Sequence, residues 1–270
     1  MRARLLAGSI VSAAISLAGW RAKALSGRGA LTATGVGASI ATGSSWPGMV
    51  VLGTFFISSS ALSRLGSQPE IVAKGSQRDE RQVLANGAVA AIAALVGGKV
   101  DRALGTSLAA GALAAATADT WATELGAGSQ RIPRLAWSGR SVPPGTSGGV
   151  TPRGSLASLG GAIAIGIVTV AVVGVADGRS RALRIGPGVV VAGLAGSLAD
   201  SLLGELVQER RRCPACDVLT EARVHHCGTA TVHAGGVRGV DNDVINLACT
   251  AVGLLAMIPF GVQSASSDCS

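Results

Sequence analysis

The residues best suited to chemistry are aspartates that end long uncharged runs. Asp119 and Asp200 each follow more than ten residues without a charge, and Glu124 and Glu205 come five positions later. An ionisable group at membrane depth is costly, so it usually faces a partner or a water-filled cavity. Asp119 and Asp200 could converge on one cation. Mg²⁺ would suit such a site, because it binds one or two carboxylates together with phosphate oxygens. The alternative is that these acids are solvated at helix ends among the lipid headgroups.

The two pairs of acids lie in similar segments. GALAAATADTWATEL at 111–125 and AGLAGSLADSLLGEL at 192–206 align without gaps, with aspartate and glutamate at matching positions. We interpret them as an internal repeat whose halves meet at a shared axis; chance similarity between alanine-rich segments is the alternative. Residues five apart on a regular helix point roughly 140° away from each other. We therefore expect the glutamates to join the aspartates only where a helix ends between them, as Gly126 and Gly204 would allow.

A glycine-rich stretch at 144–154, PGTSGGVTPRG, precedes an apolar run. Glycine lets the backbone approach a ligand closely, and the N–H groups of such a loop and of a following helix attract anions. The stretch is not a Walker A loop, because no Gly-Lys-Ser/Thr follows the glycines. It predicts a phosphate-binding loop, with a flexible connection as an equal alternative. The candidate residues are Gly145, Thr146, Ser147, Gly148, Gly149 and Arg153.

VDNDVIN at 240–246 begins the last apolar run. Asp241 stands where a helix N-cap is expected and Asp243 falls in the first turn, which is a sufficient structural explanation for both acids. Asp243 and Asn246 are also neighbours on one helix face, since they are three residues apart. Asp243 and Asn246 could therefore both hold a cation or a phosphate-bound water, with Asp241 as a further Mg²⁺ ligand.

Cysteines and histidines gather in one polar stretch. Cys213 and Cys216 form a CxxC motif, and His225, Cys227 and His233 follow. Two thiolates, a third cysteine and one histidine would complete a tetrahedral Zn²⁺ site. We expect a closed, structural zinc site formed by Cys213, Cys216, Cys227 and His225, with free thiols or a redox pair as the alternative.

The composition indicates a membrane protein. Hydrophobic residues make up 48% of the chain and charged residues only 14%, with a mean hydropathy of +0.48. Soluble domains carry roughly 25% charged residues. The 39 glycines suit close helix packing in lipid better than the alternative of a soluble Ala/Gly-rich core. The net charge of +8 is spread between apolar runs and tyrosine is absent, so we expect arginines that set topology and no nucleic-acid partner.

These observations predict an all-α, polytopic membrane protein with six to eight membrane helices. Residues 1–270 would form a single integral membrane domain, with a polar Cys/His loop at 208–240 inserted between the last helices. The first apolar run could be a cleaved signal, but we expect a retained helix because apolar runs recur downstream. Asn86, in an apolar helix, could hold a helix interface or a lipid headgroup. The apolar runs fall at about 5–20, 30–43, 47–63, 83–98, 103–118, 156–176, 186–204 and 244–262.

Several motifs in order resemble one family. They are FFISSSALSRLG, RQVLANG, ADTWATELG, GTSGGVTPRG, GSLADSLLGELVQ and VDNDVINL. From about residue 20 to 262, the chain is similar to the integral membrane family of unknown function 92. That family includes transmembrane protein nineteen of animals and the phytyl-phosphate kinase of the plant tocopherol pathway. The Cys/His loop is not shared by all members, which makes it an accessory feature.

The resemblance implies a lipid-phosphate kinase. An NTP, for example CTP, would donate its γ-phosphoryl group to an isoprenyl monophosphate such as phytyl phosphate. By similarity to the family motifs, the catalytic candidates are Asp119, Glu124, Asp200 and Asp243. Phosphoryl transfer relies on positioning and charge neutralisation, so Mg²⁺ on Asp119 and Asp200 fits this chemistry. The glycine-rich loop and Arg153 would hold the nucleotide phosphates, and Asn246 would assist.

Two other functions remain open from the residues. A repeat with acids at the midplane is also typical of a cation- or proton-coupled transporter. A non-catalytic membrane scaffold is the third possibility. A photosynthetic source would place the protein in a chloroplast membrane.

Overall fold

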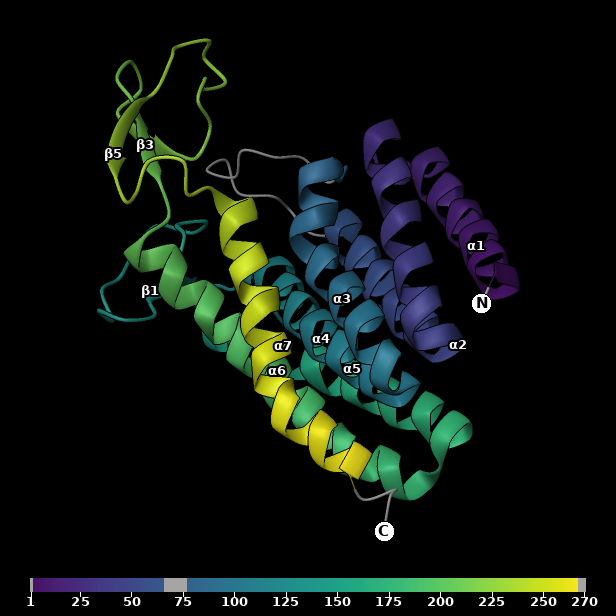
Figure 1. Cartoon of the computed structure of the whole chain (residues 1–270). Helices are drawn as coiled ribbons and strands as arrows, with labels where there is room; N and C mark the ends of the chain where they lie inside the picture. The colour runs from purple at the N-terminus through teal and green to yellow at the C-terminus, as the bar shows by residue number, and fades with distance from the viewer. Residues whose placement is uncertain (1, 66–76, 267–270) are drawn as a thin grey trace.

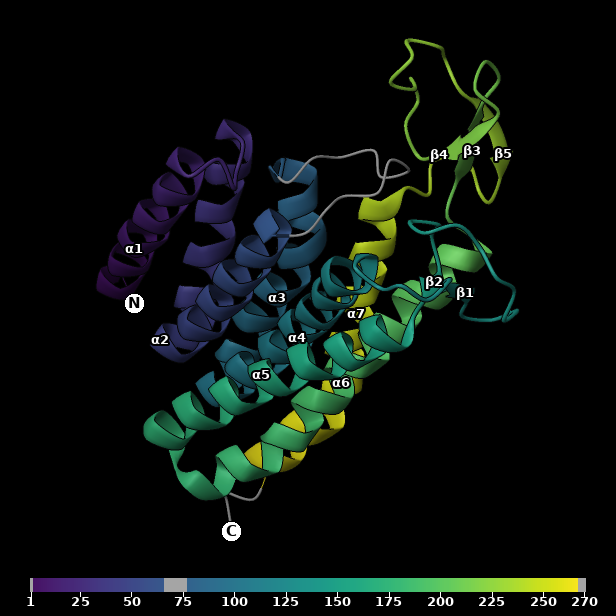
Figure 2. The ribbon, with the colours of Figure 1, turned by 180° about the vertical axis from the view of Figure 1, so that it is seen from behind.

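The computed structural model describes residues 2–65 and 77–266. Within these ranges the chain is mostly helical, with seven α-helices and five short strands (Figures 1 and 2). The helices are α1 (Arg2–Arg21), α2 (Gly27–Leu65), α3 (Glu80–Val100), α4 (Arg102–Ala127), α5 (Pro152–Asp177), α6 (Arg179–Leu206) and α7 (Asn242–Ser266). The strands are β1 (Arg134–Leu135), β2 (Gly149–Val150), β3 (Arg210–Cys213), β4 (Val218–Thr220) and β5 (Val232–Gly235).

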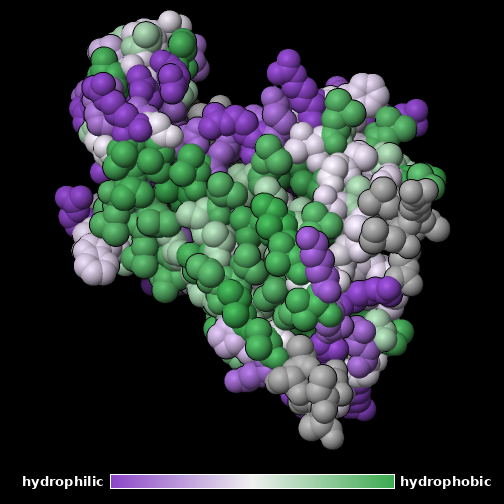
Figure 3. Space-filling view, viewed as in Figure 1, coloured by the Kyte–Doolittle hydropathy of each residue, from purple (hydrophilic) through white to green (hydrophobic). Residues whose placement is uncertain are grey.

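The protein is an integral, multi-pass membrane protein. Five of the described helices, α2, α3, α5, α6 and α7, are long and apolar enough to cross a bilayer. Their outer faces carry large apolar side chains, such as Ile57, Ile92 and Leu255, each at least 60% exposed. Figure 3 shows hydrophobic residues covering much of the flank of the bundle, while hydrophilic residues gather on the β3–β5 region. An exposed apolar flank of this extent fits contact with lipid.

Helix α4 lies at the centre of the bundle. It packs against α2, α3, α5, α6 and α7, and its residues from Ala103 to Ala118 are almost all buried. Most of them are Ala, Gly, Ser or Thr, which let neighbouring helices approach closely. The central helix therefore needs little apolar bulk, which is why it is not among the five apolar spans.

Helix α2 folds back on itself at Ser45. That residue has φ 60° and ψ −153°, outside helical values, and Pro47 follows it. The two halves pack together, because a Cβ on Gly37 in the first half would touch Leu52 in the second. The separate apolar runs at 30–43 and 47–63 correspond to these halves.

Gly43 tests the close packing of the first half of α2. A Cβ at Gly43 would overlap the backbone of Ala94 in α3, whereas one at Gly35, also in α2, would meet nothing within 4 Å. We expect Gly43→Ala to destabilise the folded protein by roughly 1–3 kcal/mol, because the two backbones must separate. Gly35→Ala should leave stability unchanged or raise it slightly. Thermal unfolding of both variants in detergent would check this, and equal melting temperatures would contradict it.

Two polar segments lie at one end of the bundle, beside the start of α7 (Figures 1 and 2). The first, between α4 and α5, contains the antiparallel pair β1–β2. The second, between α6 and α7, forms a three-stranded antiparallel sheet in the order β4-β3-β5. Part of the polar stretch predicted before α3, residues 66–76, lies outside the described residues.

Candidate functional site

A cleft of about 660 Å³ opens at the end of the bundle where the polar segments lie. Its size is within the usual range for small-molecule sites. The C-terminal parts of α2, α4 and α6 line it together with the N-terminal parts of α3, α5 and α7. A helix N-terminus presents unpaired N–H groups that can bind an anion, whereas a helix C-terminus carries partial negative charge that favours a cation, so the cleft offers both kinds of contact.

Asp119 from α4 and Asp200 from α6 meet inside this cleft. Their carboxyl groups are close enough to share a hydrogen bond. Oδ1 of Asp200 is buried and has no hydrogen-bond partner among the described residues. Two adjacent carboxylates repel each other unless a proton or a cation lies between them. Buried carboxylate oxygens of this kind are the ligands that a hard divalent cation such as Mg²⁺ prefers, so the residues fit such an ion.

The two glutamates of the matching segments 111–125 and 192–206 point in different directions. Glu124 lines the cleft and accepts a hydrogen bond from Ser63 Oγ at 2.5 Å. Glu205 turns away and accepts hydrogen bonds from the backbone N–H groups of Trp137, at 2.6 Å, and Ser138, at 3.1 Å. Glu205 therefore fastens the segment between α4 and α5 onto the end of α6, and only Glu124 belongs to the cleft.

The first turn of α7 also faces the cleft, with Asp241, Asp243 and Asn246 in its lining. Asp241 caps the helix by accepting from the N–H of Val244 at 3.2 Å. Arg81 of α3 pairs with Asp241 at 2.9 Å and lies 3.7 Å from Asp243. The structural role expected of Asp241 is thus confirmed, and Asp243 and Asn246 line the same cleft as the acid pair.

The glycine-rich segment borders the cleft through Gly145, Thr146, Ser147, Gly148 and Gly149. Gly148 has φ +77° and rests against the last turn of α6. Some of the donors predicted for phosphate are used within the protein. The N–H of Gly149 donates to Thr146 O at 3.0 Å, and the hydroxyl of Ser147 donates to a carboxylate described next.

Glu221, which follows β4, was not predicted from the sequence. One of its oxygens, Oε1, accepts hydrogen bonds from Ser147 Oγ and from Gln208 Nε2, both at 2.7 Å. Burial raises the pKa of this carboxyl, and the charges of Asp241 and Asp243 raise it further, while the two hydrogen bonds act in the opposite direction. Glu221 thus ties the Cys/His region to the glycine-rich segment. A lone acid in a polar loop carries no pattern that could have identified it.

The arginines of the cleft were also missed. Arg78, Arg131, Arg211 and Arg223 contribute to its lining. They come from three polar segments far apart in the sequence, so no local motif joins them. Arg153, which was predicted for the phosphate loop, is not part of the lining and instead donates to Gly128 O at 2.8 Å, at the end of α4.

The Cys/His residues form a compact cluster beside the cleft. One ligand atom each from Cys213, Cys216, His225 and Cys227 lies within 4.8 Å of the others. Cys213 Sγ and Cys227 Sγ are 3.6 Å apart, close to the ~3.8 Å edge of a tetrahedral zinc–thiolate site. Contacts with Thr229 and His225 lower the pKa of the Cys227 thiol to about 5. The four residues could hold a metal ion, whereas His233 lies apart, 3.6 Å from Glu209.

Comparisons with known proteins agree with the membrane fold. The family described as integral membrane protein DUF92 matches residues 10–254. Protein PGR of Arabidopsis thaliana is 30% identical over 268 residues, which cover 90% of this chain and 91% of the relative. A membrane protein of Methanocaldococcus jannaschii, MJ0933, is 32% identical over 197 residues, covering 71% and 74% of the two chains. No solved structure matches.

Proposed function

We propose a phosphoryl-transfer function for this chain, which belongs to the integral membrane family DUF92. The chain would transfer the γ-phosphoryl group of an NTP to an isoprenyl monophosphate, such as phytyl phosphate, and form a diphosphate. The observation that carries the proposal is the meeting of Asp119 and Asp200 in a large cleft. The N-termini of α3, α5 and α7 border the same cleft, and their N–H groups would bind phosphate oxygens, while the acid pair would bind the cation.

In the proposed reaction, an oxygen of the lipid monophosphate attacks the γ-phosphorus of the nucleotide. The bond from this phosphorus to the β–γ bridging oxygen breaks, and its electron pair leaves with the NDP. Asp119 and Asp200 would hold Mg²⁺, which when bound neutralises charge on the phosphate oxygens. Arg131 and Arg223 line the cleft and would bind the nucleotide phosphates.

The remaining cleft residues position the reactants in this scheme. Asp243 is only 6% exposed and would orient the acceptor phosphate together with Asn246. The glycine-rich segment forms one wall of the cleft, and Glu221 holds that wall in place through Ser147. Positioning of this kind supplies most of the rate enhancement in phosphoryl transfer, because the protein forms no covalent intermediate.

The test is an assay with purified protein in lipid nanodiscs. Phytyl monophosphate, Mg²⁺ and each NTP in turn are supplied, and formation of the lipid diphosphate is measured by mass spectrometry. Diphosphate formation that requires both Mg²⁺ and an NTP would support the proposal. Absence of product with every nucleotide, from protein shown to be folded, would overturn it. Cation uptake into proteoliposomes without nucleotide consumption would favour a transporter instead.

We also propose that the Cys/His cluster holds a structural Zn²⁺ ion. Three thiolates and one imidazole are a ligand set typical of closed, four-coordinate zinc sites. The cluster lies in the same chain segment as Glu221, which follows β4. A zinc ion there would fix the small β-sheet and, through it, Glu221 at the glycine-rich segment.

Metal content tests the zinc proposal directly. Purified protein should contain about one zinc per chain, and Cys213→Ser or Cys227→Ser should remove most of it. His226→Ala is the matched control, because His226 neighbours the cluster but does not belong to it. Elemental analysis of the three variants and the parent protein would measure this. Zinc-free parent protein, or equal zinc loss in the His226 variant, would rule the site out.

A further inference from the structure

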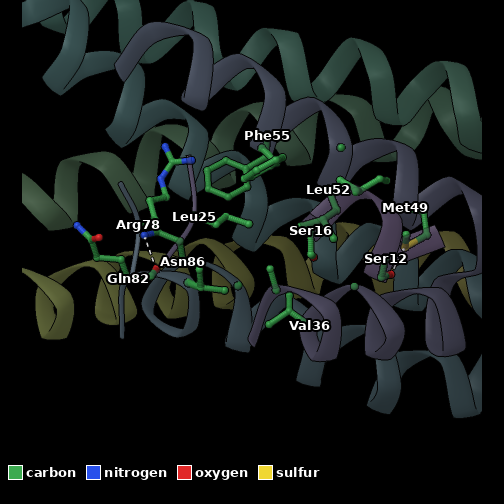
Figure 4. A pocket seen from close by; sticks show the side chains of 17 residues that line it. Ser12, Ser16, Leu25, Val36, Met49, Leu52, Phe55, Arg78, Gln82 and Asn86 are labelled. Carbon is green, nitrogen blue, oxygen red and sulfur yellow. Dashed lines mark hydrogen bonds between the residues drawn. The ribbon is translucent and has the colours of Figure 1, made fainter. Parts of the chain in front are cut away.

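A second cavity, of about 70 Å³, lies among α1, α2 and α3 (Figure 4). Apolar side chains dominate its wall, including Val36, Leu52 and Phe55. It has less than half the volume of the ~150 Å³ engineered apolar cavity that binds benzene. The cavity therefore has room for only the first few carbons of a chain. A longer chain would have to continue between the helices toward the lipid.

Three polar residues border both the cavity and the large cleft. Arg78, Gln82 and Asn86 are shared by the two linings, and Figure 4 shows all three together at one end of the cavity. Of these residues, Gln82 and Asn86 lie on the first turns of α3, and Arg78 immediately precedes Asp79, the N-cap of that helix. Among the residues that border both, Arg78 is the one with a positively charged side chain.

Arg78 is held firmly at this junction. Its backbone N–H donates to Ala24 O at 3.0 Å, and its carbonyl accepts from Ser26 N at 2.9 Å. Its guanidinium donates to Ser60 Oγ at 3.0 Å and lies over the ring of Phe55, 5.9 Å from the centroid. Glu124, which lines the cleft, interacts electrostatically with this guanidinium. A fixed guanidinium between an apolar cavity and a polar cleft is complementary to an anionic head group on an apolar chain.

We infer that this cavity binds the proximal carbons of a single-chain lipid phosphate, with the phosphate on Arg78. The head group would then project into the cleft toward Asp119 and Asp200, while most of the chain lies in the bilayer. This inference names the acceptor site of the proposed function and rests on it for the reaction only. Binding itself can be tested without any turnover.

The test uses a photoactivatable dodecyl monophosphate that carries a diazirine on its proximal carbons. Protein in nanodiscs is irradiated with this probe, and labelled residues are mapped by mass spectrometry. We expect labels on the cavity-lining residues of α1, α2 and α3, and competition by unlabelled phytyl monophosphate but not by inorganic phosphate at the same concentration. Arg78→Gln should reduce this labelling by about tenfold, the usual effect of losing a charged hydrogen bond.

A second variant tests the tail site alone. Gly53 lines the cavity, and a Cβ there would meet nothing within 4 Å, so Gly53→Leu should fill the cavity without disturbing the backbone. It should reduce labelling as strongly as the arginine variant. Gly35→Leu, in equally open space outside the cavity, and Arg28→Gln, at an exposed ion pair with Glu80, should stay within about twofold of the parent protein.

The inference is overturned if labels spread evenly over all lipid-facing helices, or if Gly53→Leu leaves labelling unchanged. Equal competition by inorganic phosphate would show a head-group site without a tail site, and would also overturn it. Labelling that follows these expectations, in a protein that makes no lipid diphosphate, would keep the binding site and reject the kinase function. Formation of lipid diphosphate without labelling of the cavity would support the kinase function and reject this binding site.

Discussion

Asp200→Asn and Asp119→Asn should each reduce lipid diphosphate formation by at least about a hundredfold, equivalent to ~2.7 kcal/mol of transition-state stabilisation. The reason is that each change removes one of the two carboxylates that meet in the cleft. The rate is measured at saturating Mg²⁺ and nucleotide. Asp217→Asn is the control, because its carboxylate is 81% exposed on the small β-sheet region and pairs with Arg212, and neither residue lines the cleft.

Thermal stability separates this effect from misfolding. Without divalent cations, two adjacent carboxylates repel each other, so either asparagine variant should melt no lower than the parent protein. Adding Mg²⁺ should raise the melting temperature of the parent protein and of Asp217→Asn, because a bound ion stabilises the folded state. The melting temperatures of Asp119→Asn and Asp200→Asn should rise much less when Mg²⁺ is added. Activity above one tenth of the parent rate in either of them would reject the acid pair as the cation site.

The acid pair could be anticipated because its signal is local. Asp119 and Asp200 interrupt long uncharged runs, and the matching segments 111–125 and 192–206 suggested that the two residues share a site. The structure places these segments on α4 and α6, which pack together. Helical geometry does not distinguish Glu124 from Glu205, since both helices continue through the acids. Glu124 nevertheless lines the cleft with Asp119, contrary to the expectation, whereas backbone N–H groups of Trp137 and Ser138 hold Glu205 away from it. The repeat itself stays a prediction.

The rest of the cleft depends on contacts that no local pattern encodes. Glu221 reaches Ser147 across 74 positions of sequence, and Arg78 lies in a polar stretch with no periodicity. For Arg153 the local motif was misleading. The motif predicted that Arg153 binds phosphate, but its side chain donates a hydrogen bond to Gly128 O at the end of α4. The run at 103–118 was predicted as apolar, but its central position was not, because that position depends on contacts with five other helices.

Gly148→Ala should displace the glycine-rich wall of the cleft. Gly148 has φ +77°, and a Cβ there would lie 2.5 Å from the backbone nitrogen of Glu205 and 2.7 Å from Ser201 O. The segment must therefore move off α6, which would break the contact between Ser147 and Glu221. A displacement near 1 Å at a positioning element can reduce the reaction rate by about a hundredfold, and we expect a loss of that size.

Gly139→Ala is the matched control for this variant. Gly139 lies in the same segment with φ +67°, but a Cβ there would meet nothing within 4 Å. The Gly139→Ala variant has the same backbone strain, alanine at positive φ, as Gly148→Ala, but its Cβ meets no other atom. Its activity should therefore stay within about threefold of the parent protein. Tryptic cleavage after Arg140 gives a readout independent of turnover and should accelerate only in Gly148→Ala. Equal loss of activity in both variants would attribute the effect to backbone strain and reject the role of close contact between this segment and α6.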